Sequence, residues 1–177
     1  GNTWSADDLD VERLPILGIA LSQLHALKRP SQSLDLRQWA ESYCRGLDEP
    51  KLTVAKAWFE QMDGLLSELA SSQSCLCHND LVAENMIYGR KLIFVDWEYA
   101  MANDPYFDLA VVCAHHSLDE TASRVLLESY CGLADPATRQ RLATWQQVYL
   151  RLYGLWLMAT QGAQGVSKIA ELQARLE

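Results

Sequence analysis

The spacing of hydrophobic residues predicts helices in the first part of the chain. Leu17, Leu21 and Leu24 repeat at helical spacing and predict an amphipathic helix over residues 12–27, led by a polar stretch in which Ser5 is a candidate cap. Pro30 ends this helix, because proline cannot continue helical hydrogen bonding. Further helices are predicted over about residues 34–46 and, with an apolar face on Val54, Trp58, Met62, Leu65 and Leu69, up to Ser71.

The pattern changes after the polar residues 71–74. Short apolar runs at residues 75–77, 86–88 and 92–95 predict small strands, and Gly89-Arg90 is the turn of a hairpin between the last two. The polar residues between these runs therefore lie at strand ends and on one loop, where a rigid scaffold usually presents chemistry.

Helices are predicted again in the remaining sequence. Asp104-Pro105 starts a helix that is buried over residues 109–114, and another helix over residues 121–130 ends at Gly132. Asp135-Pro136 starts a long helix to about Met158, residues 162–165 form a flexible link, and the last residues form a terminal helix. The expected fold class is α+β and mostly helical, in a single domain over residues 1–177.

Composition and charge narrow the class of protein. The 177 residues are 49% hydrophobic, which is sufficient for a core, and their formal charge of −8 disfavours nucleic acid and attracts small cations. Five cysteines, with Cys75 and Cys77 in a predicted strand, favour reduced thiols over a disulfide framework. No apolar run reaches the roughly 18 residues that span a membrane, and no signal peptide is visible, so a cytoplasmic protein without a membrane partner is expected.

Three polar residues form the main candidate site. Asp80 follows a predicted strand, Asn85 lies five residues later, and Asp96 ends the next apolar run. Phosphoryl transfer needs an acceptor for the proton of the attacking hydroxyl, which suits Asp80, and hard oxygen ligands for Mg²⁺, which suit Asn85 and Asp96. Each residue alone is as readily a turn former or a cap, and only their joint order and spacing favours catalysis.

Two histidine sites have simpler interpretations. His25 is expected to be a helix-end histidine that bonds a neighbouring loop. His115 and His116 with Cys113 suggest a metal site, but adjacent helical residues point in different directions and no second spaced pair accompanies them.

The segments His78-Asn79-Asp80-Leu81-Val82-Ala83-Glu84-Asn85 and Val95-Asp96-Trp97-Glu98-Tyr99-Ala100 resemble the catalytic core of the choline/ethanolamine kinase family, within the aminoglycoside phosphotransferase group of protein-kinase-like enzymes. Asp104-Pro105-Tyr106-Phe107-Asp108-Leu109-Ala110 and Leu24-His25-Ala26-Leu27 resemble further segments of that group. The resemblance implies Asp80 and Asn85 as catalytic residues, Asn85 and Asp96 as magnesium ligands, and His78 and Asp108 as braces of the loop.

The resemblance also implies a binding site for a cationic alcohol. Tyr153-Gly154-Leu155-Trp156 is similar to the aromatic choline-binding helix, although its first residue is Tyr where the family has Trp. Tyr153 and Trp156 project to one side of a helix and offer ring faces to a quaternary ammonium, or they fill the core. Trp97 and Glu98 are the other implied substrate residues, and Glu98 either adds negative charge or bonds a neighbouring backbone group.

The implied fold is the C-terminal lobe of the protein-kinase-like fold, in which a small β-hairpin carries the active site. A glycine-rich phosphate loop and its lysine are not found in these residues, so the N-terminal nucleotide-binding lobe of the same protein is an expected partner. The implied activity is phosphorylation of choline or ethanolamine with ATP and Mg²⁺, weak or absent in this chain alone. Thiamine or another small molecule as substrate, and a non-catalytic binding lobe, are the alternatives.

Overall fold

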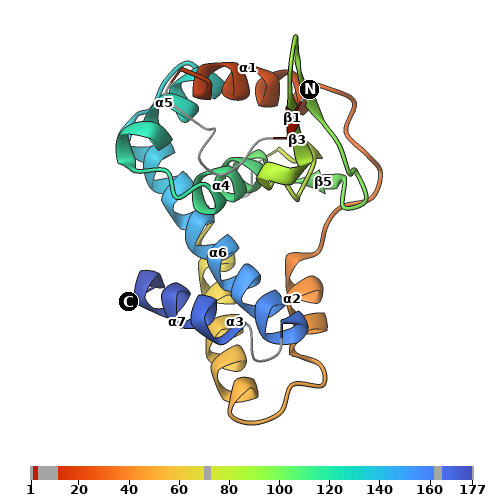
Figure 1. The fold of residues 1–177 in the computed structure, drawn as a ribbon, viewed down its shortest axis with the longest axis vertical. Helices are drawn as coiled ribbons and strands as arrows, with labels where there is room; N and C mark the ends of the chain where they lie inside the picture. Colours follow the sequence, from red (N-terminus) through yellow and green to blue (C-terminus); the bar gives the residue numbers. More distant parts are fainter. Residues whose placement is uncertain (1, 4–11, 70–72, 162–164, 177) are drawn as a thin grey trace. The chain divides into compact units, whose positions relative to one another are not determined.

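Figure 1 shows the order of helices and strands in the structure, which is a computed structural model. The structure describes residues 2–3, 12–69, 73–161 and 165–176. The helices are α1 (Leu14–His25), α2 (Leu36–Cys44), α3 (Lys51–Glu68), α4 (Pro105–His115), α5 (Glu120–Cys131), α6 (Pro136–Thr160) and α7 (Gly165–Leu176). The strands are β1 (Asn2–Thr3), β2 (Cys75–Cys77), β3 (Met86–Tyr88), β4 (Leu92–Phe94) and β5 (Met101–Asn103), and a single 3-10 turn, η2 (Ala83–Asn85), precedes β3. The predicted class, α+β and mostly helical, is confirmed.

The chain forms two compact units. One contains residues 1–33 and 72–146, and the other contains residues 34–71 and 147–177. The first part of helix α6 therefore belongs to the first unit, and the rest of the helix belongs to the second.

Helices α1 and α5 pack closely in the first unit. The spacing of Leu14, Leu17 and Leu21 puts all three on one face of α1, where they are fully buried. Gly18 lies on the same face, and a Cβ atom there would be only 2.7 Å from the Cβ of Ser129 and 2.8 Å from the carbonyl oxygen of Leu126 in α5. Only glycine fits this close approach without a shift of one helix.

Two small antiparallel sheets complete the first unit. The predicted hairpin is present, with Tyr88 of β3 opposite Leu92 of β4, and β1 adds to the other edge of β3. Strands β2 and β5 form the second sheet, with Cys77 opposite Met101. This pairing brings the segment after the hairpin back beside β2, the strand that leads into residues 78–85, called the candidate loop below.

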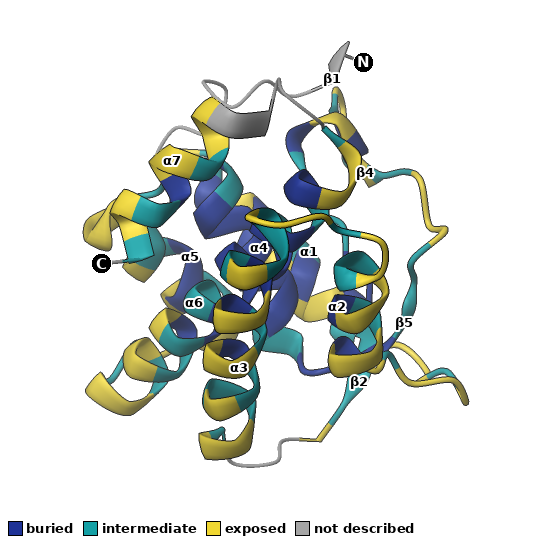
Figure 2. Ribbon diagram, turned by 90° about the horizontal axis from the view of Figure 1, so that it is seen from below, coloured by how far each residue is buried: buried dark blue, intermediate teal, exposed yellow. Residues whose placement is uncertain are grey.

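Helices α4 and α5 begin at aspartate caps. The Asp104 carboxylate accepts a hydrogen bond of 2.9 Å from the backbone N–H of Tyr106, and Asp119 accepts one of 2.8 Å from Ala122. Every residue of α4 from Phe107 to Ala114 is buried, and Figure 2 colours the whole chain by burial. Helix α5 ends at Gly132, whose φ of +79° is in the left-handed region that favours glycine.

The second unit is helical in its described part. Trp58 and Met62 of α3 are buried, as their helical spacing predicts. The Trp58 ring packs against Gly154 of α6, where a Cβ atom would lie 1.9 Å from the ring. Lys51 donates a 3.2 Å hydrogen bond to the carbonyl oxygen of Met158, and Arg37 of α2 forms an ion pair with Asp63 of α3.

The helix predictions are confirmed in position, with ends shifted by a few residues. Strand β5 was not predicted, because Asn103 and Asp104 indicated only a turn and a helix start. The polar stretch expected to lead into the first helix instead begins with β1, while Ser5 and residues 70–72 and 162–164 lie outside the described residues. Among the described helices, none combines the length and the hydropathy that crossing a membrane requires.

Candidate active site

Two segments of the first unit form the candidate site: residues 78–85 between β2 and β3, and residues 95–100 after β4. Backbone hydrogen bonds join them, since the N–H of Val95 donates to the carbonyl oxygen of Asn85 at 3.0 Å. The Nε2 of His78 bonds the carbonyl oxygen of Val95 at 2.8 Å. The hairpin therefore holds Asp96 beside the loop that carries Asp80 and Asn85.

Asp80 and Asn85 are in direct contact. The side-chain nitrogen of Asn85 donates to the backbone carbonyl oxygen of Asp80 at 2.8 Å and to its Oδ2 at 3.0 Å. Burial raises the pKa of Asp80, and the negative charge of Asp96 acts in the same direction, while His78 and the bond from Asn85 oppose the rise. Asn85 therefore fixes Oδ2 of Asp80, and burial increases the proton affinity of this Asp80 carboxylate.

Asp96 presents an exposed carboxylate. Its φ of +62° lies in the left-handed region, which aspartate tolerates better than most residues and which re-aims the chain at the end of the hairpin. Within the described part of the chain, this carboxylate accepts no hydrogen bond. The structure thus brings together the three residues that the sequence singled out, Asp80, Asn85 and Asp96.

Trp97 and Glu98 follow Asp96 on the same segment. The Trp97 ring lies 4.7 Å from the His78 ring, between centroids, and its Nε1 donates to the carbonyl oxygen of Phe94 at 3.0 Å. The Trp97 residue stays 42% exposed, and Glu98 is exposed as well. Burial first, and then the negative charges of Glu98, Asp80 and Asp96, raise the pKa of Tyr99.

Asp108 connects the loop to helix α4. Its carboxylate is fully buried and accepts hydrogen bonds of 2.8 Å from the backbone N–H groups of both His78 and Asn79. The Nε2 of His25 lies 3.0 Å from the same carboxylate, and its Nδ1 lies 2.9 Å from the Tyr130 hydroxyl. The expected loop partner of His25 was therefore wrong: this histidine bonds side chains of α4 and α5, because α1 packs against α5 and against β2, on which α4 also packs.

The sequence interpretation missed two asparagines that shape the loop. Asn79 has a φ of +67°, and its side chain donates to the carbonyl oxygen of Tyr99 at 2.8 Å. Asn103 in β5 donates to the side-chain oxygen of Asn79 at 2.9 Å. The sequence offered one signal for Asn79, because asparagine tolerates a left-handed backbone and is common in turns. The hydrogen-bond partners of Asn79 are some twenty residues away in the sequence, so they give no local pattern.

The aromatic candidates lie on the part of α6 in the second unit. Tyr149, Tyr153 and Trp156 form a stack, with 6.0 Å between the first two ring centroids and 5.6 Å between the last two. Because the Tyr153 and Trp156 planes differ by only 16°, the rings form one platform rather than two walls facing a common point. Both side chains are half-buried, so they are not simply part of the core.

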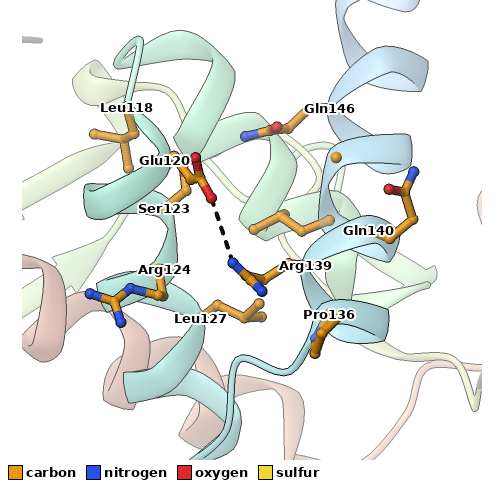
Figure 3. Close-up of a pocket in the computed structure, with 11 residues that line it drawn as sticks. Leu118, Glu120, Ser123, Arg124, Leu127, Pro136, Arg139, Gln140 and Gln146 are labelled. Carbon is orange, nitrogen blue, oxygen red and sulfur yellow. Dashed lines mark ion pairs between the residues drawn. The ribbon is translucent and has the colours of Figure 1, made fainter.

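Among the other polar groups, His115 of α4 lies 3.8 Å from Glu84 of the loop and lowers the pKa of Asp80. A hollow of about 490 Å³ lies between α5 and the start of α6, crossed by a 3.5 Å ion pair between Glu120 and Arg139 (Figure 3), and none of the candidate catalytic residues lines it. Cys113, His115 and His116 form no metal-ligand cluster in the described part of the chain.

Comparisons with known proteins show the family of the chain. The family described as phosphotransferase enzyme family (APH) matches residues 2–147. The protein LicA of Haemophilus influenzae is 50% identical over 57 residues, which are 32% of this chain and 21% of LicA. The Tyr153–Trp156 segment lies beyond the residues that the family matches.

Solved structures share the fold over nearly the whole chain. A choline/ethanolamine kinase family protein from Mesorhizobium loti has a TM-score of 0.83 at 22% identity, over 99% of this chain and 67% of that one. The choline kinase LicA from Streptococcus pneumoniae has a TM-score of 0.78 at 21% identity, over 99% and 66%. A LicA structure in complex with AMP has a TM-score of 0.76 at 20% identity, over 99% and 65%. The chain thus spans about two thirds of the length of these kinases.

Proposed function

Because the chain belongs to the phosphotransferase enzyme family, we propose that it is part of a kinase that transfers a phosphoryl group from ATP to the hydroxyl of a small cationic alcohol, choline first and ethanolamine second. One observation carries the proposal: Asn85 holds Asp80 by a 3.0 Å bond beside the unpaired carboxylate of Asp96. This is the set of groups that phosphoryl transfer to an alcohol requires. Similarity to kinases of choline and ethanolamine, and to a LicA structure with bound AMP, supports the choice of substrates.

Asp80 would accept the proton of the attacking hydroxyl. Its Oδ2 is held by Asn85, while its Oδ1 accepts no hydrogen bond from the described residues and is free to meet a substrate. The raised pKa improves this role, because a base becomes a stronger proton acceptor as its pKa approaches the working pH. Asn85 keeps the carboxylate oriented, so that little reorganisation is needed when the alcohol binds.

The donor set fits Mg²⁺. Asn85 uses its side-chain nitrogen on Asp80, which leaves its amide oxygen available, and Asp96 offers an exposed carboxylate. Oxygen ligands of this kind are those that Mg²⁺ prefers. Asn85 and Asp96 would hold the ion, which when bound would neutralise charge on the phosphates.

The cationic group of the alcohol needs acids or aromatic faces, and each of the two units offers candidates. Glu98 and Trp97 lie next to the proposed metal ligand Asp96, and a quaternary ammonium is held by carboxylates and by ring faces because it cannot donate hydrogen bonds. Tyr153 and Trp156 provide a half-buried aromatic platform in the second unit. We propose all four as substrate residues.

The test is ADP formation by the intact protein with choline, ethanolamine and thiamine, with and without Mg²⁺. Asp80→Asn should lower kcat by about 10²–10⁴-fold, the usual contribution of a general base, and leave nucleotide affinity nearly unchanged. Asp119→Asn is the matched control, since Asp119 is exposed and asparagine caps a helix equally well.

Equal turnover by the Asp80→Asn variant and the unaltered protein would refute Asp80 as the base. Faster turnover of thiamine than of choline would replace the proposed substrate. Absence of magnesium-dependent ADP formation with every alcohol would favour a binding function over catalysis.

A further inference from the structure

A second cluster of reactive side chains lies behind the candidate loop. Cys75 and Cys77 are two residues apart on β2, so their side chains point to the same face of the strand. Their sulfur atoms are 3.6 Å apart, and a ring nitrogen of His25, the last residue of α1, lies within 4.8 Å of both. No residue of this cluster takes part in the proposed phosphoryl transfer.

We propose that Cys75, Cys77 and His25 form a binding site for a thiophilic divalent cation, Zn²⁺ in the first place. Two thiolates and one imidazole are a known ligand set for zinc, with the fourth position open to water. Zn–S distances of about 2.3 Å in tetrahedral geometry place two sulfurs about 3.8 Å apart, close to the observed separation of 3.6 Å. The same geometry needs about 3.6 Å between sulfur and nitrogen, so the ring nitrogen of His25 has to move by at most about 1.2 Å from the 4.8 Å limit.

The surroundings of the two thiols favour a cation. Cys75 is half-buried, so an ion can reach it from solvent, whereas Cys77 is fully buried. The hydrogen bond with Cys77 lowers the pKa of Cys75, whereas the same bond and then burial raise the pKa of Cys77. The negative charges of Asp104 and Asp108 raise the pKa of both thiols and attract a cation. Binding would release the thiol protons to solvent as the two Zn–S bonds form.

The hydrogen bonds of His25 identify the nitrogen that would bind. Asp108 accepts bonds from two backbone N–H groups and is therefore an acceptor for the Nε2–H of His25 as well. The Nδ1 then carries the lone pair and accepts the Tyr130 hydroxyl, 2.9 Å away. A metal at Nδ1 would displace only Tyr130 and keep the histidine on its carboxylate, the arrangement that commonly orients zinc-bound histidines.

Retention of the bond between His25 and Asp108 connects this site to the candidate active site. Asp108 also holds the backbone of His78 and Asn79, so an ion bound at Nδ1 would fix His25 and, through it, the support of the loop. Binding does not depend on turnover, so the metal site and the proposed kinase function can fail separately.

The experiment is titration of the reduced, metal-free intact protein with Co²⁺ in excess Mg²⁺, followed by displacement with Zn²⁺. The unaltered protein should develop sulfur-to-cobalt charge-transfer absorption that Zn²⁺ removes. Cys75→Ser should weaken Co²⁺ and Zn²⁺ binding by more than about 100-fold, because loss of a ligand exceeds the effect of losing a residue that only orients a ligand. Cys44→Ser, a partly exposed cysteine outside the cluster, should keep both signals.

Thermal unfolding with Zn²⁺ and Zn²⁺ binding by Tyr130→Phe test the metal site further. Zn²⁺ should raise the Tm of the unaltered protein but not that of Cys75→Ser, whose metal-free Tm should be unchanged because Cys75 is only half-buried. Tyr130→Phe should bind Zn²⁺ more tightly, and weaker binding would overturn the assignment of Nδ1. Absence of the cobalt–sulfur band while the cysteines are free thiols, or an equal band in Cys75→Ser, would overturn the site.

Discussion

Replacement of Asp108 by asparagine tests the support of the candidate loop. Oδ2 of Asp108 is bonded to the N–H of His78 and to Nε2 of His25, and Oδ1 accepts the N–H of Asn79. Asparagine has one carbonyl oxygen, so its NH₂ group must face at least one of these donors. We expect Asp108→Asn to lose about 2–3 kcal/mol of stability, since an unsatisfied buried N–H costs about 1–3 kcal/mol and the remaining bonds lose a charged acceptor.

The Asp108→Asn substitution should weaken the candidate loop locally as well as lower the global stability of the protein. Hydrogen exchange at the amides of His78 and Asn79 should accelerate by about 30- to 150-fold, because every 1.4 kcal/mol corresponds to a factor of ten. Urea unfolding gives the global loss, and Asp119→Asn serves as the control because that exposed cap should remain within about 0.5 kcal/mol. Unchanged exchange at both amides in Asp108→Asn would show that the buried carboxylate does not hold the loop.

Three further outcomes are expected. Gly18→Ala should destabilise the protein by about 1–3 kcal/mol in thermal unfolding, because its Cβ meets backbone atoms, whereas Gly64→Ala, with nothing within 4 Å, should stabilise α3 by about 0.5–1 kcal/mol. Gly154→Ala should destabilise to a similar extent as Gly18→Ala, and Trp58→Leu in the same chain should relieve the loss. Turnover should rise with pH through a pKa above the usual aspartate value, since Asp80 must be deprotonated, and Asp80→Asn should abolish that limb in a pH–rate profile.

The helices and the hairpin were predictable because their signals are local. The leucine spacing of α1 and the Gly89-Arg90 turn each lie within one element. Asp80, Asn85 and Asp96 were predictable as a group for the same reason: the hairpin that joins them is short, so their order in the sequence limits their positions in space. Their meeting at one place follows from the turn chemistry and the strand register.

The contacts across the fold were not predictable from the residues. His25 and Asp108 are separated by 83 positions, and their hydrogen bond exists only because α1 packs on the region of α4 and β2. The same packing brings His25 to Cys75 and Cys77, which the sequence indicated only as unpaired thiols. Strand β1 has only two residues, and β5, Met101–Asn103, ends in a polar residue and lacks the continuous apolar run that marked the other strands.

The polar residues in and around the candidate loop form two groups: those whose hydrogen bonds hold the loop and those that keep an oxygen without a hydrogen bond. His78, Asn79 and Asp108 are buried and bond backbone groups or each other, so their first effect is on the position of the loop. Asp80 and Asp96 keep carboxylate oxygens without a hydrogen-bond partner among the described residues, and burial first, with the charge of Asp96 as a smaller cause, raises the pKa of Asp80. Carboxylate oxygens without a partner add little to folding stability, which agrees with the roles proposed for Asp96 toward a cation and for Asp80 toward a substrate proton. Substitutions in the first group should therefore change stability and turnover together, whereas substitutions in the second should lower turnover and leave the protein equally stable or more so.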